Sequence, residues 1–593
     1  MVELKRMWEG IPAVVLILVM VIPFLLAWNR LDEVAELGLL DSILDLDSRR
    51  QTKEAVSFSL LIGLISSIAT AIIGVPLAFM LGRWKWPGHR LLKVLSTLPF
   101  IVPSIVAAMG FIELTRPNGL LHSATGLDLL KESGMIGRLS ESLGFEHGGW
   151  LLAILMAHVW FNIALFTRLV EPVITRLDEN LVEQVRLLPC GRNAAGRIRV
   201  LWFPLLWVHI ASAMVLTFVF CATSFAIILH LGGFEYYTME RAMAELGGSA
   251  GICAQGASSC YGATASEVVL ALSSIQLLII LSALWIQSAL GRRCDETWPL
   301  ATDAARPPPP SPTTLRNSIP WLVMAGIMLF ITTPMFSIFN ASLKVRGSFS
   351  TEAWSLAFSN HSLIGGMSLW EHLQNSMFYA ILCAALVIPF ALLVCEVCHA
   401  AEKRARTDLG NRRRHLLWAS FNENLALAPL ALSSVMIGYG VLIGVMSLDS
   451  TLIHSWWLPL MGHCMVALPF AVRSILQPLR SLDPHHEEMA ATLGLQPFTR
   501  WWRIRMRLLR APLIIATSLV LAISLGEFGA SWVVLRASEN ATLPMFIDAA
   551  ISKPFDQLAR PSAMVAATIL LLFCSILHLA VERFRAPDQT GGI

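Results

Sequence analysis

Glu527 falls in the middle of a long apolar stretch, residues 511–535, where a carboxylate is costly unless it faces a cavity or a partner. Ser224 lies 303 residues earlier in another apolar stretch, and His158 and His463 lie in two further ones. We expect these four side chains to line a path through a membrane. Two alternatives stay open: Glu527 pairs with a neighbouring group and locks two parts of the chain together, and the histidines are satisfied structural residues. None of the four indicates a metal site.

The sequence carries no pattern typical of catalysis. The phosphate-binding pattern Gly-x-x-x-x-Gly-Lys-Ser/Thr is absent, so the chain cannot hydrolyse ATP alone. No nucleophile and base lie together in a soluble region large enough to form an active site. We therefore predict a protein that is not an enzyme, has no catalytic residues and binds no cofactor itself.

Composition indicates a membrane protein with many spans. Hydrophobic residues make up 55% of the 593 residues, charged residues only 14%, and the mean hydropathy is +0.64. A soluble chain carries about 25% charged residues, so this chain is mostly surrounded by lipid. A bilayer core takes roughly 20 apolar residues per helix. We expect an all-α fold with about twelve spans, near 11–28, 55–81, 94–114, 150–170, 205–231, 265–290, 319–341, 377–398, 424–446, 456–476, 511–535 and 562–580.

The distribution of charge predicts the orientation of these spans. If the N-terminus is inside, the inner segments carry more lysine and arginine than the outer ones. This bias favours a multi-pass protein of the cell (plasma) membrane with both termini in the cytoplasm. The first span lacks a small-residue cleavage site and is followed directly by a second span, so we expect an anchor and not a removed signal peptide.

A proline-rich run between the sixth and seventh spans divides the chain. Proline runs form stiff, extended spacers, so we predict a cytoplasmic linker at 291–318 between halves at 1–290 and 319–593. Each half has six spans, an even number, so the halves are expected to be parallel repeats with the same orientation. A cytoplasmic loop between the fourth and fifth spans recurs in both, at about 171–204 and about 477–510.

The second loop predicts a short helix that docks on a partner. Met489, Ala490 and Leu493 can share one face of a helix, and Gly494 then lets the chain turn. Such a helix suits a groove on a soluble protein. An unspecialised basic loop is the alternative, which the recurrence of the loop at a matching position disfavours.

The sequence Glu488-Met-Ala490-Ala491-Thr-Leu-Gly494, with Ile504 ten residues later, resembles the E-A-A-x-x-x-G motif of bacterial ABC importer permeases. This resemblance implies the type I importer fold and a coupling helix that docks on an ATPase subunit. It implies coupling roles for Glu488, Ala490, Ala491 and Gly494. The chain departs from the motif at its end, where Met-Arg replaces Leu-Pro.

The first loop resembles the same motif less closely. Gly191 and Pro204 keep the spacing, but Val185 stands where the motif has glutamate, and Glu183 lies two residues earlier. The resemblance implies coupling roles for Glu183, Gly191 and Pro204. We expect weaker or asymmetric docking at this loop.

Two permease halves fused in one chain resemble the thiamine and iron(III) importer permeases, and segments 225–233 and 524–530 resemble the thiamine type. The resemblance implies two copies of an ATPase subunit, which use ATP and Mg, and an external solute-binding protein. No nucleic acid partner is implied. Thiamine or ferric iron is the expected cargo, with polyamine or sulfate as alternatives. A twelve-helix secondary transporter driven by an ion gradient is the rival from another class.

Cysteine spacing predicts no metal site. Cys395 and Cys398 form a Cys-x-x-Cys pair at the end of a span without a second pair, which favours packing. Cys253 and Cys260 lie in an outer loop, and the sequence leaves a disulfide between them open.

Overall fold

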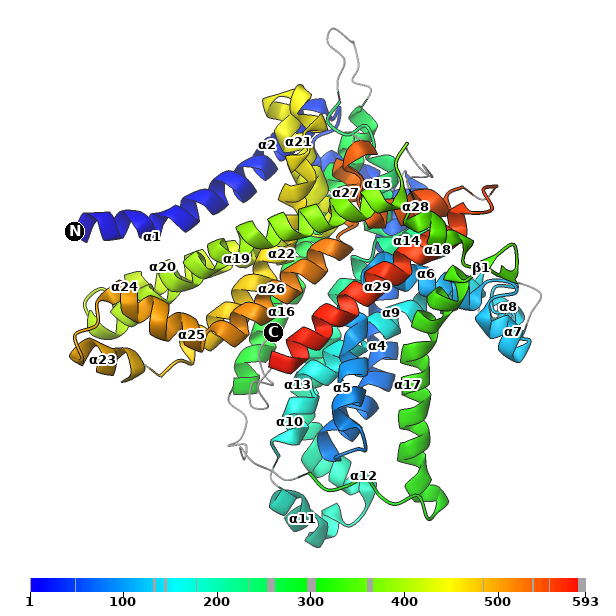
Figure 1. The fold of residues 1–593 in the computed structure, drawn as a ribbon, viewed down its shortest axis with the longest axis horizontal. Helices are drawn as coiled ribbons and strands as arrows, with labels where there is room; N and C mark the ends of the chain where they lie inside the picture. The colour runs from blue at the N-terminus through cyan, green and yellow to red at the C-terminus, as the bar shows by residue number, and fades with distance from the viewer. Residues whose placement is uncertain are drawn as a thin grey trace.

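The computed structural model is helical apart from one two-stranded antiparallel hairpin among the residues that it describes. Figure 1 shows its arrangement. The described residues are 2–47, 49–131, 135–142, 147–177, 179–233, 235–252, 262–295, 306–359, 366–483, 485–535, 538–553 and 555–584.

The prediction of an all-α membrane protein with about twelve spans is confirmed. Within the described residues, nine helices are long and apolar enough to cross a membrane, and three bent pairs raise the number to as many as twelve. Each of the twelve predicted stretches overlaps one of them. The bends measure 102°, 103° and 67°. All three pairs contain a proline near the bend (Pro103, Pro429 and Pro512), and proline removes a helical hydrogen bond and favours a break.

The N-terminal part of the chain runs through α16. Its elements are α1 (Val2–Leu16), η1 (Ile17–Val21), α2 (Ile22–Val34), α3 (Leu39–Asp45), α4 (Arg50–Arg83), α5 (His89–Thr97), η2 (Leu98–Phe100), α6 (Ser104–Thr115), α7 (Leu120–Thr125), α8 (Met135–Ser142), α9 (Gly148–Leu169), α10 (Glu171–Thr175), α11 (Glu179–Leu187), η3 (Pro189–Gly191), α12 (Ala194–Arg197), η4 (Ile198–Trp202), α13 (Phe203–Ala222), α14 (Ala226–Leu231), α15 (Met239–Leu246) and α16 (Ala263–Asp295).

The C-terminal part begins with α17. Its elements are α17 (Leu315–Ser342), β1 (Lys344–Val345), β2 (Ser348–Phe349), α18 (Glu352–Ala357), α19 (Leu369–Thr407), α20 (Arg412–Leu427), η5 (Ala428–Ala431), α21 (Ser434–Leu448), η6 (Ser450–His454), α22 (Trp457–Arg480), α23 (His485–Thr492), α24 (Pro497–Arg500), η7 (Trp501–Arg505), α25 (Met506–Leu508), α26 (Arg510–Gly526), α27 (Gly529–Val534), η8 (Ser538–Asn540), α28 (Leu543–Ile551) and α29 (Ala559–Phe584).

Two groups of helices diverge from a common region (Figure 1). One group contains α19, α20, α22 and α26 and ends in α23, α24 and α25. The other contains α4, α5, α9 and α13 and ends in α11 and α12. The groups meet around α21, α27, α15, α28 and α14, where α15 contacts α21 and α28 contacts α6. The segments around α11 and α23 therefore lie far apart, at the two diverging ends.

The first helical span of each part packs against the other part. α2 contacts α21, and α17 contacts α6. Glycine permits this close approach: a Cβ atom on Gly440 would lie 2.3 Å from the ring of Phe24, and one on Gly110 would lie 3.0 Å from the carbonyl oxygen of Pro334. Gly110 and Gly440 are 330 residues apart and sit at corresponding places in α6 and α21. The two parts therefore interlock through matching contacts.

The described end of the proline-rich run, residues 306–314, lies against the N-terminal part. Two proline carbonyl oxygens in this run accept hydrogen bonds, one from the Lys85 backbone N–H and one from the Trp321 indole N–H, both at 2.9 Å. The Arg306 guanidinium lies 3.6 Å from the carboxylate of Glu171. The run is therefore attached to the ends of α4, α10 and α17, beside the start of the first loop.

The fifth and eleventh spans differ from the prediction. The sequence predicts apolar spans at 205–231 and 511–535, but α13 ends at Ala222 and α26 ends at Gly526. Each is followed by a short break and a short helix, α14 or α27. Hydropathy stays high across both breaks, so periodicity alone does not locate them. Phe225 and Phe528, one in each break, stack on each other between the two parts.

Candidate translocation cavity and coupling segments

A cavity of about 310 Å³ lies where the two parts meet, and both parts line it. Four breaks in helices supply most of its wall: the turns before α6 and α21, and the breaks before α14 and α27. We call this the central cavity. Its principal lining residues are Phe100, Pro103, Ser104, His158, Phe161, Asn162, Phe220, Thr223, Ser224, Phe225, Pro429, Ser433, Ser434, Phe470, Glu527 and Phe528.

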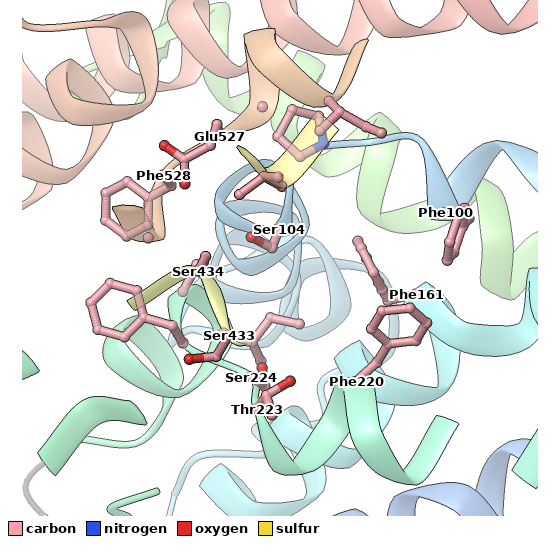
Figure 2. Close-up of a pocket in the computed structure, with 18 of the residues that line it drawn as sticks. Phe100, Ser104, Phe161, Phe220, Thr223, Ser224, Ser433, Ser434, Glu527 and Phe528 are labelled. Atoms are coloured by element: carbon pink, nitrogen blue, oxygen red, sulfur yellow. The ribbon is translucent and has the colours of Figure 1, made fainter. Parts of the chain in front are cut away.

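One side of the central cavity is aromatic. Figure 2 shows Phe100, Phe161 and Phe220 grouped there. The Phe100 ring lies 6.1 Å from that of Phe161 and 5.9 Å from that of Phe220, centroid to centroid. The Arg168 guanidinium lies 4.8 Å from the Phe100 centroid, in cation–π contact. This wall can receive a flat, apolar or cationic ring.

Hydroxyl groups line other parts of the cavity wall. Ser104 and Ser434 are the first residues of α6 and α21, and Ser433 caps α21 by accepting a hydrogen bond from the Met436 N–H at 3.1 Å. Ser224, predicted to line the path, lies in the break before α14 (Figure 2). Short polar side chains at helix starts can offer hydrogen bonds to a passing solute.

Glu527 also lines the cavity, but its carboxylate is already engaged. Its oxygens accept hydrogen bonds from the Ala530 N–H at 2.8 Å and the Ser531 N–H at 3.0 Å, and from the Ser531 hydroxyl. Glu527 therefore caps the N-terminus of α27, where free backbone N–H groups and the helix dipole favour a negative charge. The side chain lies at a break between helices and not in the middle of one.

The two predicted histidines occupy different environments. His463 is bonded through Nδ1 to Ser524 Oγ at 2.7 Å and through Nε2 to Ser531 Oγ at 3.0 Å, and it lies 3.7 Å from Glu527. His463 and Glu527 share the Ser531 hydroxyl as a hydrogen-bond partner. His463 is not among the residues of the described cavity lining. His158 lines the cavity, with Nδ1 bonded to Ser66 Oγ at 2.9 Å.

Phe225 and Phe528 stack on each other across the junction of the two parts. Their ring centroids lie 5.6 Å apart with an interplanar angle of 20°. The Trp532 ring meets Phe225 edge-on at 5.5 Å. Both phenylalanines are buried, at 5% and 2% exposure, and both line the central cavity. The stack lies in the region where the two helix groups converge.

In the second loop, α23 projects from the end of its helix group. Glu488, Ala491 and Gly494 are exposed, and Gly494 has φ +78°, which an L side chain rarely adopts. Its N–H bonds to the Ala491 carbonyl and ends the helix. The expectation of one shared apolar face is wrong. Ala490 is buried at 4% exposure, whereas Met489 and Leu493, one turn apart, are both exposed.

Charged side chains connect the second loop to α19. The Arg505 guanidinium bonds to both Glu396 of α19 and Glu487 of α23. Burial raises the pKa of the Glu487 carboxyl, but the Arg505 hydrogen bond and charge outweigh it and leave the pKa below its usual value. Arg505 therefore links α23 to α19 through charged hydrogen bonds.

The first loop has a different local structure. Glu183 is exposed on α11, while Val185 is buried beneath it. A Cβ atom on Gly191 would lie 1.7 Å from the Val185 carbonyl oxygen, so close packing requires glycine there. Pro204 is exposed near the start of α13, which belongs to a span that begins at Ala194. The loop between spans is shorter than predicted because its arginine-rich end is helical.

Sequence reasoning missed the aromatic wall and the serines at the helix starts. A signal existed: Pro99 and Pro429 lie 330 residues apart, as do Ser104 and Ser434, and mark the two bent spans. Among the described residues, no group of three or more His, Cys, Asp or Glu side chains could hold a metal ion. Cys253 and Cys260 lie outside the described residues.

The chain resembles known permeases along most of its length. It is 24% identical over 555 residues to the thiamine transport system permease protein of Haemophilus influenzae, covering 90% of this chain and 89% of that protein. The Escherichia coli protein of the same name is 23% identical over 538 residues, covering 89% and 88%. A probable ABC transporter permease protein of Sinorhizobium fredii is 21% identical over 591 residues, covering 96% and 95%.

A family model matches the chain twice, at residues 74–296 and 412–587. The two matches bear out the predicted repeat and decide against a secondary transporter. They also agree with the prediction that the chain is a membrane component and not an enzyme. Because the matches cover more than half of the chain, it belongs to the family described as "Binding-protein-dependent transport system inner membrane component" and is a permease component of an ABC importer.

Proposed function

We propose that this permease carries thiamine into the cytoplasm through the central cavity. The observation that carries the proposal is the lining: a wall of three phenylalanines faced by hydroxyl groups. Thiamine joins a cationic thiazolium ring to an aminopyrimidine ring. Aromatic faces attract cations and stack on flat rings, and hydroxyl groups hydrogen-bond to ring substituents. The names of the permeases from Haemophilus influenzae and Escherichia coli support the same cargo.

The lining suits ferric iron less well. Iron sites in proteins use imidazole and carboxylate ligands, several at a time. The described cavity lining has one carboxylate, Glu527, and it already accepts three hydrogen bonds. His158 is the one histidine of that lining. These groups do not form a set of ligands for a hard cation, and sulfate would leave the aromatic wall unused.

The exposed loops are proposed as the docking points for two ATPase subunits in the cytoplasm. On α23, Met489 and Leu493 are 64% and 80% exposed and offer an apolar face to a groove, with Gly494 ending the helix. On α11, Leu187 is 86% exposed. Glu183 and Glu488 are exposed acids, one in each loop. Both chain termini and the proline-rich linker then lie on the cytoplasmic side.

The divergence of the two helix groups supports an inward-facing arrangement (Figure 1). ATP binding would draw the ATPase subunits together, and with them the distant α11 and α23. The two groups would then close at that end and separate where Phe225 stacks on Phe528, at the external side that receives the binding protein. This is alternating access by rigid-body rotation of two repeats.

The test is uptake of labelled thiamine by cells with and without the gene, in a strain that has no other thiamine uptake. The proposal predicts that uptake is lost with the gene and returns with a plasmid copy, while ferric iron uptake is unchanged. Unchanged thiamine uptake in the deletion strain would refute the cargo. Loss of ferric iron uptake alone would assign the permease to iron instead.

A further inference from the structure

We infer that the N-terminal part alone supplies a hydrogen-bonding site for the cargo, formed by His158 Nε2 and Asn162 Oδ1. The inference rests on the proposed thiamine transport and specifies which edge of the thiamine molecule the protein recognises. Both residues line the central cavity and are nearly inaccessible, at 1% and 2% exposure. Neither His158 Nε2 nor Asn162 Oδ1 has a hydrogen-bond partner among the described residues.

The remaining polar atoms of both side chains are fixed by neighbours. His158 Nδ1 bonds to Ser66 Oγ at 2.9 Å. The Asn162 amide nitrogen donates to the His158 carbonyl oxygen at 2.9 Å and to Cys221 Sγ at 3.3 Å. The two residues are four apart on α9, so they share one face of the helix. Both orientations are therefore held by protein contacts, and one buried polar atom of each is left without a partner among the described residues.

Two buried polar atoms without partners, on two residues of the cavity lining, indicate a partner that arrives from the cavity. About nine in ten buried polar groups in proteins are hydrogen-bonded, because an unpaired one loses its water without compensation. The cost is recovered when a solute in the cavity supplies the missing hydrogen bonds. The cargo is such a solute, since it passes this wall during transport.

The described residues of the C-terminal part form no equivalent site at the corresponding helix. His463 corresponds to His158, but both of its ring nitrogens are bonded to serine hydroxyls. Ala467, buried at 0% exposure, stands four residues after His463, where the N-terminal part has Asn162. The two halves of the path are therefore chemically different although their helices correspond.

The pair fits an amino group beside a ring nitrogen. Asn162 Oδ1 accepts a hydrogen bond. When His158 Nδ1 accepts the Ser66 hydroxyl hydrogen, Nε2 carries the ring proton and donates. An amino group on the cargo would donate to Asn162, and the adjacent ring nitrogen would accept from His158. The aminopyrimidine ring of thiamine presents this edge, whereas ferric iron and oxyanions do not.

The test measures binding of labelled thiamine to the permease–ATPase complex in lipid nanodiscs, without the binding protein. The competitors are unlabelled thiamine and the analogue that carries a carbonyl oxygen in place of the amino group. On the wild-type complex, the analogue should compete roughly tenfold more weakly, the effect of one well-placed hydrogen bond. This comparison needs no variant. Equal competition by the analogue, or no thiamine binding to the wild-type complex, overturns the site.

Variants then locate the contact. Asn162→Leu and His158→Phe should each weaken thiamine binding roughly tenfold and bring thiamine and its analogue closer together. Asn422→Leu is the matched control, because Asn422 on α20 is also fully buried, donates to a carbonyl one turn earlier and has an unpaired Oδ1, but does not line the described cavity. It should bind thiamine like the wild type.

The outcomes separate the site from the cargo. If Asn162→Leu and Asn422→Leu bind thiamine equally well, Asn162 is structural and the inference fails. If cells that carry Asn162→Leu take up thiamine at the wild-type rate, the site also fails, while the proposed cargo stands. If wild-type cells show no uptake of thiamine that depends on this gene, the proposed function itself fails.

Discussion

Phe225 and Phe528 stack with their centroids 5.6 Å apart and their planes 20° from parallel. They occupy matching positions, 303 residues apart, in the two repeats. A contact between equivalent residues lies near the pseudo-two-fold axis that relates the repeats, so separation of the repeats at this point would break it. The stack is therefore suited to close the cavity when the opposite end is open.

Removing one ring of this stack should uncouple the transporter. Phe225→Ala deletes a buried aromatic side chain, a change that costs about 3–5 kcal/mol in a packed core. The closed arrangement loses this energy, so we expect a higher basal ATPase rate of the assembled complex in the absence of binding protein. Phe546→Ala, also at a fully buried site but outside the described cavity lining, is the control. Equal basal rates in both variants would show that the stack does not hold the cavity closed.

Gly494→Arg should prevent an ATPase subunit from docking at the second loop. The residue has φ +78° and open space around it, so the substitution strains the turn and adds a long charged side chain at the proposed docking face. We expect loss of ATPase on co-purification with normal membrane insertion. Gly366→Arg has the same kind of backbone, φ +82° and open surroundings, and should retain the ATPase. Normal co-purification and transport by Gly494→Arg would refute the coupling role.

Glu527→Gln should destabilise the break before α27. The carboxylate accepts hydrogen bonds from two backbone N–H groups and one hydroxyl. In glutamine an NH2 group replaces one of the two oxygens, and this group cannot accept a hydrogen bond from these donors. Loss of a charged acceptor at a buried site costs about 1–3 kcal/mol. A lower midpoint of thermal aggregation of the detergent-solubilised protein would report it. Ser224→Ala, at the matching position, should shift this midpoint less.

We predict that the stability of the folded protein depends on pH through Asp548, which lies at the junction of the two parts. It lies on α28, outside the predicted spans, with its carboxylate 3.5 Å from His230 Nε2. Burial raises the pKa of its carboxyl from 3.8 to about 6, against a hydrogen bond from Trp532. Because the folded pKa is raised, the packed arrangement loses stability as the pH rises from 3.8 to about 6.

Ionisation of Asp548 should therefore make the purified protein less resistant to heat at about pH 7.5 than at about pH 5. Asp548→Asn cannot ionise and should reduce the difference between the two pH values. The measurement is the thermal midpoint of both proteins across this range. An identical pH profile for wild type and variant would exclude Asp548 as the titrating group.

The sequence predicted the spans and the repeat because both depend on long-range averages of hydropathy and on spacing. It did not predict the breaks at Ser224 and Glu527, because hydropathy averaged over a whole span stays high there, although Gly526 and Gly529 flank Glu527. It also grouped His158 with His463, since spacing alone cannot report which ring nitrogen has a neighbour. The sequence placed Met489 and Ala490 on one apolar face, whereas Met489 is exposed and Ala490 is buried. The sequence of a short helix does not show which of its faces packs against the rest of the protein.

The most direct test of this account is uptake of labelled thiamine by cells that lack all other thiamine uptake, with and without this gene, and ferric iron uptake measured in parallel. We predict that deletion abolishes thiamine uptake, that a plasmid copy restores it, and that ferric iron uptake is unaffected. Thiamine uptake that continues unchanged in the deletion strain would contradict it.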